Sequence, residues 1–204
     1  MTHPTTARAL AALLALCITA FGTAARADDA VAVGITRDVA QVTLQGSGLT
    51  IARSQDPDAV IEGEFAKIAR ACPPFCIQPM APAPGVTTIG ELELLAMLDD
   101  PDATVIDSRV AEWYDKGTIP GAIHIPYTEA VDHLGELGCE IDFDGWDCEN
   151  ARPVALFCNG NWCGQSPTAI RQMIAAGYPA DRIFYYRGGM QAWQMLGLTV
   201  LGRD

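Results

Sequence analysis

From about residue 88 to the C-terminus, short apolar segments that favour strands alternate with segments that favour helices. Strands are predicted at residues 103–107, 122–125, 154–157 and 183–186. Helices are predicted at residues 88–98, 110–116, 128–137, 166–176 and 190–196, the first of them opening on the capping-box pattern Thr88-Ile89-Gly90-Glu91. Such alternation is typical of an α/β fold in which helices cover both faces of a parallel sheet. Ligands of these folds bind beyond the carboxyl ends of the strands.

The first 27 residues have the pattern of a secretory signal peptide. Arg8 precedes an apolar run from Leu10 to Gly22, and Ala25-Arg26-Ala27 is a small-x-small cleavage pattern. The run is shorter than the roughly 20 apolar residues of a membrane-spanning helix. We therefore expect cleavage after Ala27, a periplasmic or secreted location, and no membrane association after cleavage.

Acidic residues outnumber basic ones, with 25 Asp and Glu against 13 Lys and Arg and a formal net charge of −12. Loss of Arg8 and Arg26 with the signal peptide would change this charge to −14, because the segment contains no acid. So negative a chain repels nucleic acids and anionic membrane surfaces. We expect neither as a partner, and an anionic substrate would have to be held by local backbone amides and a few arginines.

Residues 28–80 follow a different pattern and are predicted to form an N-terminal extension. Residues 39–44 alternate in polarity, and Gly46-Ser47-Gly48 separates them from residues 49–51, which predicts a small β-hairpin. Ile61, Phe65 and Ile68 share one face of a short predicted helix. The proline-rich residues 79–85 predict a linker, so we place there the boundary between the extension and the domain formed by residues 81–204.

Cys158 lies at the end of a predicted buried strand, where a glycine-containing loop leads into a predicted helix. Ser166 is the expected N-cap of that helix, with Pro167 at its first position. Backbone amides of the loop and the positive end of the helix dipole would both stabilise a thiolate. The pattern predicts a nucleophilic Cys158, the alternative being a buried structural cysteine or half of a disulfide.

Four segments, in this order, resemble the rhodanese domain family. They are Val105-Ile106-Asp107-Ser108-Arg109, the run from Gly117 to Pro126, the strand from Val154 to Cys158, and Arg187-Gly188-Gly189-Met190-Gln191-Ala192-Trp193. The resemblance implies a three-layer rhodanese-like fold over about residues 87–202, to which the N-terminal hairpin and helix are added. It also implies a periplasmic single-domain protein whose Cys158 carries a sulfane sulfur as a persulfide.

The resemblance further implies a substrate site around Cys158. The loop residues expected to bind a small sulfur-containing anion or persulfide donor are Asn159, Gly160, Asn161, Trp162 and Gly164. Arg187 follows a predicted strand and could hold a sulfonate oxygen, or could form a surface salt bridge. The acceptor would be a thiol of a small molecule or a protein, and no metal or cofactor is expected.

Two features of the cysteine loop depart from the common rhodanese pattern. Many rhodaneses have a short loop that contains arginine and is followed closely by serine, whereas this loop has no arginine, and Ser166 comes eight positions after Cys158. The departure weakens the case for thiosulfate as the donor, and also for a phosphatase, which needs a loop arginine. Asp107 and Arg109 match a family motif and are expected to hold loops through hydrogen bonds, while His124 and His133 are expected to be packed or at the surface.

Six cysteines remain after removal of Cys17, and an even number in an exported chain indicates disulfides. Cys139 and Cys148 are predicted to close a surface loop by a disulfide. Cys72 and Cys76 are predicted to form a local disulfide, with an exchange-active redox pair and a metal site as alternatives.

Cys163 lies five residues after Cys158, in a CxxxxC arrangement, and is the main ambiguity. It could be a resolving thiol, half of a disulfide that clamps the loop, or a reduced bystander. The leading hypothesis is an exported sulfurtransferase that forms a persulfide on Cys158 and passes sulfane sulfur to a thiol acceptor. The alternatives are a thiol-disulfide oxidoreductase using Cys158 and Cys163, and a non-catalytic rhodanese-fold binding module.

Overall fold

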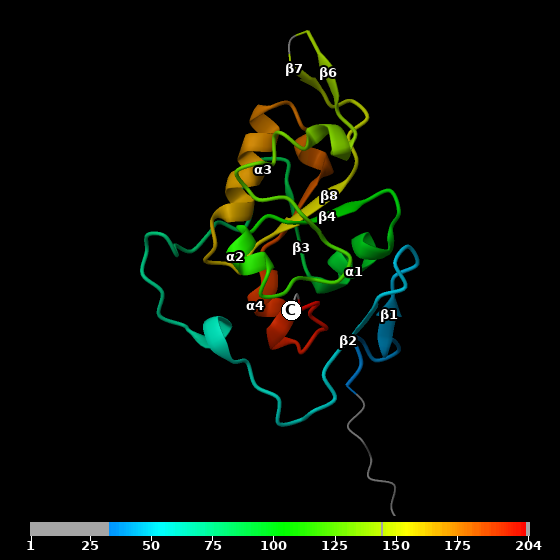
Figure 1. Cartoon of the computed structure of the whole chain (residues 1–204), viewed down its shortest axis with the longest axis vertical. Helices are drawn as coiled ribbons and strands as arrows, with labels where there is room; N and C mark the ends of the chain where they lie inside the picture. The colour runs from blue at the N-terminus through cyan, green and yellow to red at the C-terminus, as the bar shows by residue number, and fades with distance from the viewer. Residues whose placement is uncertain (1–32, 144, 203–204) are drawn as a thin grey trace, which may run out of the picture. The chain divides into compact units, whose positions relative to one another are not determined.

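A five-stranded parallel sheet lies at the centre of the computed structural model, which describes residues 33–143 and 145–202 (Figure 1). Its strands, in spatial order, are β3 (Thr87–Ile89), β9 (Ile183–Tyr186), β8 (Val154–Phe157), β4 (Thr104–Asp107) and β5 (Ile123–His124). The order of the strands requires crossover connections, which the intervening helices and loops supply. The predicted signal peptide, residues 1–27, lies outside the described residues.

The central strand β8 is buried on both of its faces. Val154 and Leu156 belong to one hydrophobic cluster, and Ala155 and Phe157 to the other. Successive side chains of a strand point to opposite faces, so an uninterrupted apolar run is suited to a strand covered on both sides. This explains why Val154-Ala155-Leu156-Phe157 reads as a continuous apolar segment.

Helices cover both faces of the sheet. The helices are α1 (Glu91–Asp99), α2 (Ala111–Tyr114), α3 (Gln165–Ala175) and α4 (Gly189–Met195), and the 3-10 helices are η1 (Gly63–Ala66), η2 (Leu134–Leu137) and η3 (Ala180–Arg182). Helix α3 packs Ile170 and Met173 into the first cluster, whereas α1 packs Leu94 and α4 packs Trp193 into the second. The predicted three-layer α/β fold is therefore confirmed. No helix of the described ranges has the length and apolar character needed to cross a membrane.

The predicted N-terminal hairpin is present. Strands β1 (Gln41–Thr43) and β2 (Thr50–Ala52) pair antiparallel, and Leu44 and Ile51 are buried in the same cluster as α1 and α4. The hairpin thus adds apolar side chains to the core of the parallel sheet.

Two predicted helices are wrong. Residues 128–133 form turns, and only η2 follows, because Leu134 and Leu137 are buried in the core while Gly138 adopts a φ of 93° that ends the segment. In the extension, η1 replaces the predicted amphipathic helix, and Ile68 is 95% exposed rather than on a buried face. Packing overrides the local helical pattern in both places.

The predicted start of the first helix is also wrong. Thr88 lies in β3, where it pairs with Tyr185 of β9, so it cannot cap a helix. Gly90 is the N-cap of α1 instead, and its amide donates a hydrogen bond to Oε2 of Glu93 at 3.0 Å. Glu93, three residues after this cap, therefore supplies the carboxylate of a capping box, and α1 begins later than the sequence pattern predicts.

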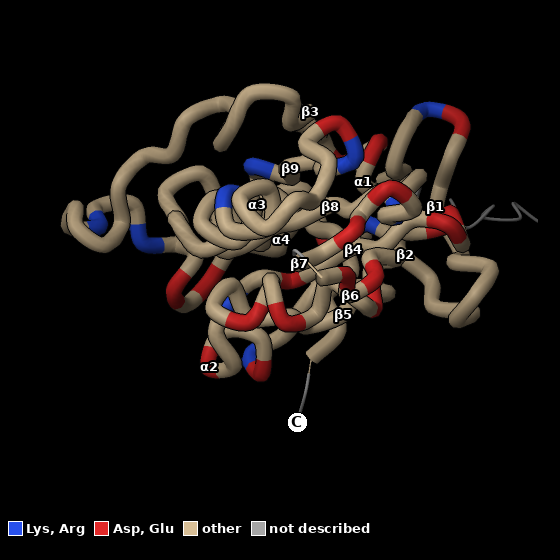
Figure 2. The backbone as a smooth tube through the Cα atoms, turned by 90° about the horizontal axis from the view of Figure 1, so that it is seen from above, with Lys and Arg blue, Asp and Glu red and all other residues tan. Residues whose placement is uncertain are grey.

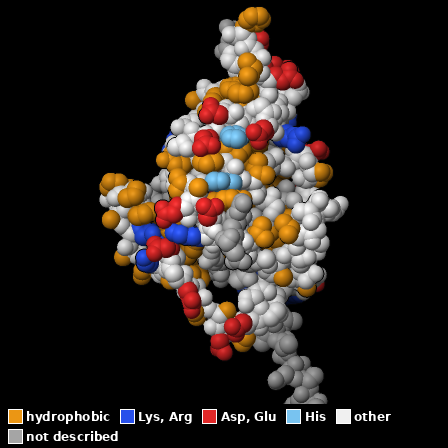
Figure 3. All heavy atoms as spheres, viewed as in Figure 1, with side chains coloured by type: hydrophobic (Ala, Val, Ile, Leu, Met, Phe, Trp, Pro, Cys, Tyr) orange, Lys and Arg blue, Asp and Glu red, His pale blue; other side chains and the backbone are white. Residues whose placement is uncertain are grey.

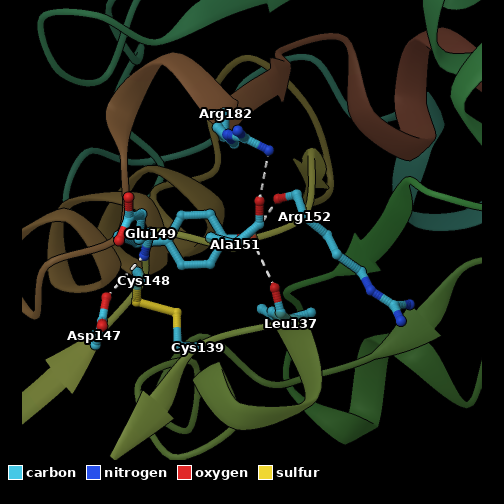
Figure 4. The surroundings of a disulfide bond; sticks show 9 residues. Leu137, Cys139, Asp147, Cys148, Glu149, Ala151, Arg152 and Arg182 are labelled. Carbon is cyan, nitrogen blue, oxygen red and sulfur yellow. Dashed lines mark hydrogen bonds between the residues drawn. A yellow bond between two sulfur atoms is a disulfide. The ribbon is translucent and has the colours of Figure 1, made fainter. Parts of the chain in front are cut away.

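A disulfide between Cys139 and Cys148 closes the hairpin of β6 (Glu140–Asp142) and β7 (Gly145–Asp147) (Figure 4). Both cysteines are buried, and backbone carbonyls beside them are held by polar side chains. Arg182 donates a hydrogen bond to the carbonyl of Ala151 at 2.9 Å, and the Tyr178 hydroxyl donates one to that of Arg152 at 2.5 Å. The disulfide is thus anchored in the first hydrophobic cluster.

Between β2 and β3 the chain forms a long segment with little regular structure, drawn in cyan in Figure 1, that runs past α4 and α2. A disulfide joins Cys72 to Cys76 within it. The amide of Gln191 in α4 donates a hydrogen bond to the carbonyl of Phe65 at 2.9 Å, and Phe65 packs against Trp113 of α2 with ring centroids 5.8 Å apart. The segment is thereby attached to the same side of the domain as both helices.

Candidate active site

The cysteine loop lies at the carboxyl end of β8, where α3 and α4 begin. The carbonyls of Cys158 and Asn159 accept hydrogen bonds from the backbone amides of Met190 and Gln191, both at 3.0 Å. Gly189 has a φ of +55°, and a Cβ there would lie 2.2 Å from the carbonyl oxygen of Cys158. Only glycine permits this close approach, so the glycine pair before α4 holds the loop against the helix.

The Cys158 thiol is buried and makes hydrogen bonds in both directions. The Ser166 hydroxyl donates to Sγ at 3.1 Å, and the thiol donates to the carbonyl oxygen of Cys163 at 3.2 Å. Burial by itself raises the pKa of Cys158, but hydrogen bonds from the Cys163 thiol, the Ser166 hydroxyl and the amides of Ser166 and Gly160 lower the pKa to about 7. Much of Cys158 is therefore thiolate, the nucleophilic form, near neutral pH.

Cys163 is also free and buried, and it acts as a donor toward the Cys158 sulfur. This hydrogen bond, together with burial, raises the pKa of Cys163 well above its ordinary value. Its own sulfur lies 3.9 Å from Oε1 of Gln165. When one of the two neighbouring thiols loses its proton, the negative charge therefore resides on Cys158, and Cys163 stays protonated.

Ser166 does not have the role predicted for it. Helix α3 begins at Gln165 with Gly164 as N-cap, so Ser166 lies inside the first turn and Pro167 follows it. From that position its hydroxyl reaches Sγ of Cys158 instead of a backbone amide of its own helix. The serine thus stabilises the thiolate directly.

A buried ion pair supports the loop from the neighbouring strand end. Nη2 of Arg109 lies 2.5 Å from Oδ2 of Asp107, and the same nitrogen donates to the carbonyl of Gly117 at 2.6 Å. Thr118 donates to Oδ2 of Asp107 at 2.7 Å, and Nη1 of Arg109 donates to Oδ1 of Asn159 at 3.3 Å. The network fixes Asn159, the residue next to Cys158, and shows the loop-holding hydrogen bonds expected of Asp107 and Arg109.

The other predicted loop residues occupy different positions. The Gly160 amide faces the thiol, Gly164 caps α3, and Asn161 is exposed with its carbonyl accepting a hydrogen bond from the Gln78 amide at 2.8 Å. Trp162 donates from its indole nitrogen to Oε1 of Gln191 in α4 at 2.6 Å. The loop residues predicted to bind substrate therefore do not all face the solvent.

Arg187 contacts the N-terminal extension. Its guanidinium donates to the carbonyl of Gln78 at 2.9 Å and to that of Pro79 at 3.3 Å. These bonds hold the end of the extension beside the cysteine loop. His124 and His133 lie outside the loop, with His124 stacked on Tyr114 at a centroid distance of 4.0 Å.

A pocket of about 240 Å³ opens beside the loop. It is lined by Pro74 and Phe75 of the extension, Trp113 of α2, and the loop residues Asn159 and 162–165. Cys163 belongs to its wall, whereas Cys158 is not among the lining residues and has 2% of its surface exposed. A larger hollow of about 500 Å³ lies around residues 33–41 and 52–55, but no cysteine lines it, so the smaller pocket is the candidate site.

Sequence reasoning missed the residues that the extension and α2 contribute. Phe75 packs edge-on against Trp162 with centroids 5.3 Å apart, and the Arg70 guanidinium lies 4.3 Å from the Trp162 ring centroid. The aromatic residue between Cys72 and Cys76 is the one local signal that could have pointed to Phe75. Within residues 33–143 and 145–202, no three His, Cys, Asp or Glu side chains group so as to hold a metal ion.

Alkylation of Cys158 by a small thiol reagent should depend on pH with an inflection near 7. The thiolate is the reactive form, so the rate should rise as pH rises through the pKa of about 7 and then level off. In Ser166→Ala the loss of one hydrogen bond to a charged group should raise that inflection by about one to two pH units. Rates of alkylation measured from acid to alkaline pH would test this.

Ser108→Ala is the matched control for Ser166→Ala. Ser108 is also buried at a strand end, but among the described groups its hydroxyl has no hydrogen-bond partner. Its removal should leave the inflection where it is. An unchanged inflection in Ser166→Ala would show that the serine does not stabilise the thiolate.

Part of the chain is similar to a known domain family and to segments of longer curated proteins. The sequence model of the family described as Rhodanese-like domain matches residues 91–196. An HTH-type transcriptional regulator of Mycobacterium tuberculosis is 34% identical over 112 residues, which are 55% of this chain and 43% of the regulator. The tRNA uridine(34) hydroxylase of Teredinibacter turnerae is 31% identical over 105 residues, 51% of this chain and 30% of the hydroxylase. The chain thus spans less than half the length of these curated relatives.

Solved structures also resemble part of the chain. A thiosulfate sulfurtransferase from Pseudomonas aeruginosa superposes with a TM-score of 0.45 at 24% identity, covering 58% of this chain and 21% of that one. A rhodanese-related protein from Thermoplasma volcanium superposes with a TM-score of 0.41 at 24% identity, covering 58% of this chain and 99% of that one.

Proposed function

The chain belongs to the rhodanese-like domain family, and we propose that it is a sulfurtransferase in which Cys158 carries the transferred sulfur as a persulfide. The observation that carries the proposal is the buried Cys158 thiol, whose pKa falls to about 7 because the Cys163 thiol, the Ser166 hydroxyl and backbone amides outweigh burial. A thiolate at neutral pH is the nucleophile that attack on a sulfane sulfur requires.

The proposed reaction has two exchange steps. In the first, the Cys158 thiolate attacks the outer sulfur of the donor, a new S–S bond forms, and the donor's S–S bond breaks with its electron pair leaving on the donor residue. In the second, an acceptor thiolate attacks the outer sulfur of the Cys158 persulfide and restores the thiolate. Neither step needs an external oxidant or reductant, and loop amides such as that of Gly160 stabilise the negative sulfur.

The donor is proposed to be a small sulfur-containing anion or a persulfide, and the acceptor a thiol. Acidic residues are spread along the chain trace and over the face seen in space-filling view (Figures 2 and 3). With a net charge of −12, the local loop amides must favour an anion against the field of the whole protein. We also propose that the protein is exported, which two disulfides favour.

A second candidate function is thiol-disulfide exchange by Cys158 and Cys163. The observation in its favour is that both cysteines are free, mutually hydrogen-bonded, and adjacent to the pocket. In this reaction Cys163 attacks the inner sulfur of a mixed disulfide or persulfide on Cys158, a Cys158–Cys163 disulfide forms, and a thiol or hydrosulfide leaves. A dithiol reductant would then be needed to restore the two thiols.

Cys163→Ser separates the two functions. If sulfur transfer is the function, this variant should still gain one sulfur atom on Cys158 after treatment with a sulfane-sulfur donor, as seen by mass spectrometry of the alkylated, digested protein. Thiol-disulfide turnover should be lost in the same variant, because no resolving thiol remains. Wild-type protein that takes up no sulfur, yet reduces or oxidises dithiol substrates in a Cys163-dependent way, would replace the first proposal with the second.

A further inference from the structure

The pocket beside the cysteine loop has aromatic walls and no charged side chain among its lining residues. Phe75, Trp113 and Trp162 come from three separate parts of the chain, namely the extension, α2 and the cysteine loop. The polar groups in the wall are uncharged: Asn159, whose side chain is already bonded to Arg109, and Gln165. The pocket therefore offers apolar surface next to the reactive sulfur.

Arg70 contacts all three aromatic rings and is not itself a lining residue of the pocket. The carbon of its guanidinium lies 4.3 Å from the ring centroid of Trp162, 5.2 Å from that of Phe75 and 6.0 Å from that of Trp113. The side chain is only 9% exposed, and Nη1 lies 3.6 Å from a carboxylate oxygen of Glu64. A buried cation in contact with several aromatic faces restricts their movement, so the walls are formed before a ligand arrives.

We propose that this pocket binds the organic group of an organic sulfane-sulfur donor, an aryl or alkyl thiosulfonate, in preference to thiosulfate. The inference rests on the proposed sulfurtransferase function and specifies its substrate class. Thiosulfate is a dianion and would lose hydration in a pocket that has no cation among its lining residues, since the nearby Arg70 contacts the wall rings and is paired with Glu64. A thiosulfonate has one negative charge, which can face the loop amides, and an apolar group, which the aromatic walls can bury.

The size of the pocket suits one ring. Its volume is about 240 Å³, and an apolar cavity of about 150 Å³ is enough to hold benzene. The carbonyl of Cys163, a residue of the wall, lies 3.2 Å from Sγ of Cys158, so the end of the pocket and the nucleophile are neighbours. An aryl group in the pocket would thus leave its sulfur end at the loop.

The chemical step is a sulfur transfer with no net oxidation. The Cys158 thiolate attacks the terminal sulfur of R–SO₂–S⁻, an S–S bond forms on Cys158, and the bond between the terminal sulfur and the sulfonyl sulfur breaks. The sulfinate R–SO₂⁻ leaves with the electron pair. Cys158 is left as a persulfide for the acceptor thiol.

Two donors with the same reactive head test the proposal. Methanethiosulfonate and benzenethiosulfonate carry the same charge and differ in the ring, so the ratio of their kcat/KM values reports the ring's contribution. Division by the same ratio for a small thiol in solution removes differences in intrinsic reactivity. We expect the corrected ratio to favour benzenethiosulfonate by about tenfold or more in the wild-type protein.

Variants of the walls should reduce this preference. Trp113→Ala and Phe75→Ala should each lower the corrected ratio by about threefold or more, because each removes part of the apolar surface around the ring. Phe143→Ala is the control, since Phe143 is a fully exposed aromatic residue on the β6–β7 hairpin and should leave the ratio unchanged. Intact-mass measurement of sulfur on Cys158 with each donor accompanies the kinetics.

The outcomes separate this inference from the function on which it rests. Equal corrected rates for the two donors, or a preference that survives both wall variants, overturn the aromatic-pocket proposal while Cys158 still takes up sulfur. A Cys158 that takes up sulfur from neither donor defeats the sulfurtransferase function together with this inference.

Discussion

Replacing Cys158 by serine should abolish sulfur uptake, with a loss of turnover of at least about 10⁴-fold. The pKa of a serine hydroxyl lies far above that of the thiol, so the variant has almost no anion at neutral pH to attack a sulfane sulfur. Serine also preserves the size of the side chain and can still accept the hydrogen bond from Ser166. Intact-mass spectrometry after donor treatment, together with the rate of acceptor persulfide formation, measures the effect.

Cys163→Ser is the matched control for this prediction, because it removes the other free, buried cysteine of the same loop. That variant should retain sulfur on Cys158, and both variants should unfold cooperatively near the wild-type temperature. Sulfur uptake by Cys158→Ser at the wild-type level would place the nucleophile elsewhere in the chain.

Replacing Asp107 by alanine should lower the free energy of unfolding by about 3–5 kcal/mol. Asp107 and Arg109 are 0% and 1% exposed, and the carboxylate accepts hydrogen bonds from Arg109 and Thr118. Its loss would leave the guanidinium charged and buried without its counter-ion, which is costly because the protein interior solvates charge poorly. Denaturant unfolding followed by tryptophan fluorescence measures the change.

Glu112→Ala is the control for the buried pair. Glu112 also pairs with a cation, Lys116 at 3.2 Å, but its side chain is 77% exposed. Water screens such a pair, so its removal should change the free energy of unfolding by no more than about 0.5 kcal/mol. If both variants lost similar amounts of unfolding free energy, burial would not explain the stability contribution of the Asp107–Arg109 pair.

The strands of the sheet were predictable to different degrees. Val154–Phe157 is a continuous apolar run, and such a run can be buried on both faces only in the middle of a covered sheet. Thr87–Ile89 was missed because an edge strand of three residues carries no clear periodicity, and Thr88 also suits a helix cap. Residues 128–133 were predicted as helix because their local pattern cannot report that Leu134 and Leu137 must enter the core.

The residues of the candidate site were also predictable to different degrees. Cys158 was predicted because strand, loop and helix start are consecutive in sequence, and this local order alone puts a thiol at a strand end. Ser166 was predicted to cap α3, but the helix begins two residues earlier than that prediction, so the hydroxyl donates to the Cys158 thiol and not to a helix end. Arg187 was predicted at a strand end, yet only the folded chain shows its bonds to the extension.

The sequence by itself determined the α/β fold and the position of the candidate nucleophile, because both depend on patterns among neighbouring residues. Only the tertiary structure decided which groups surround Cys158. Phe75, Trp113 and Trp162 are far apart in the chain and meet because the extension packs beside the cysteine loop. No local pattern encodes such a meeting, since it depends on the packing of the whole core, and the substrate class that we propose depends on it.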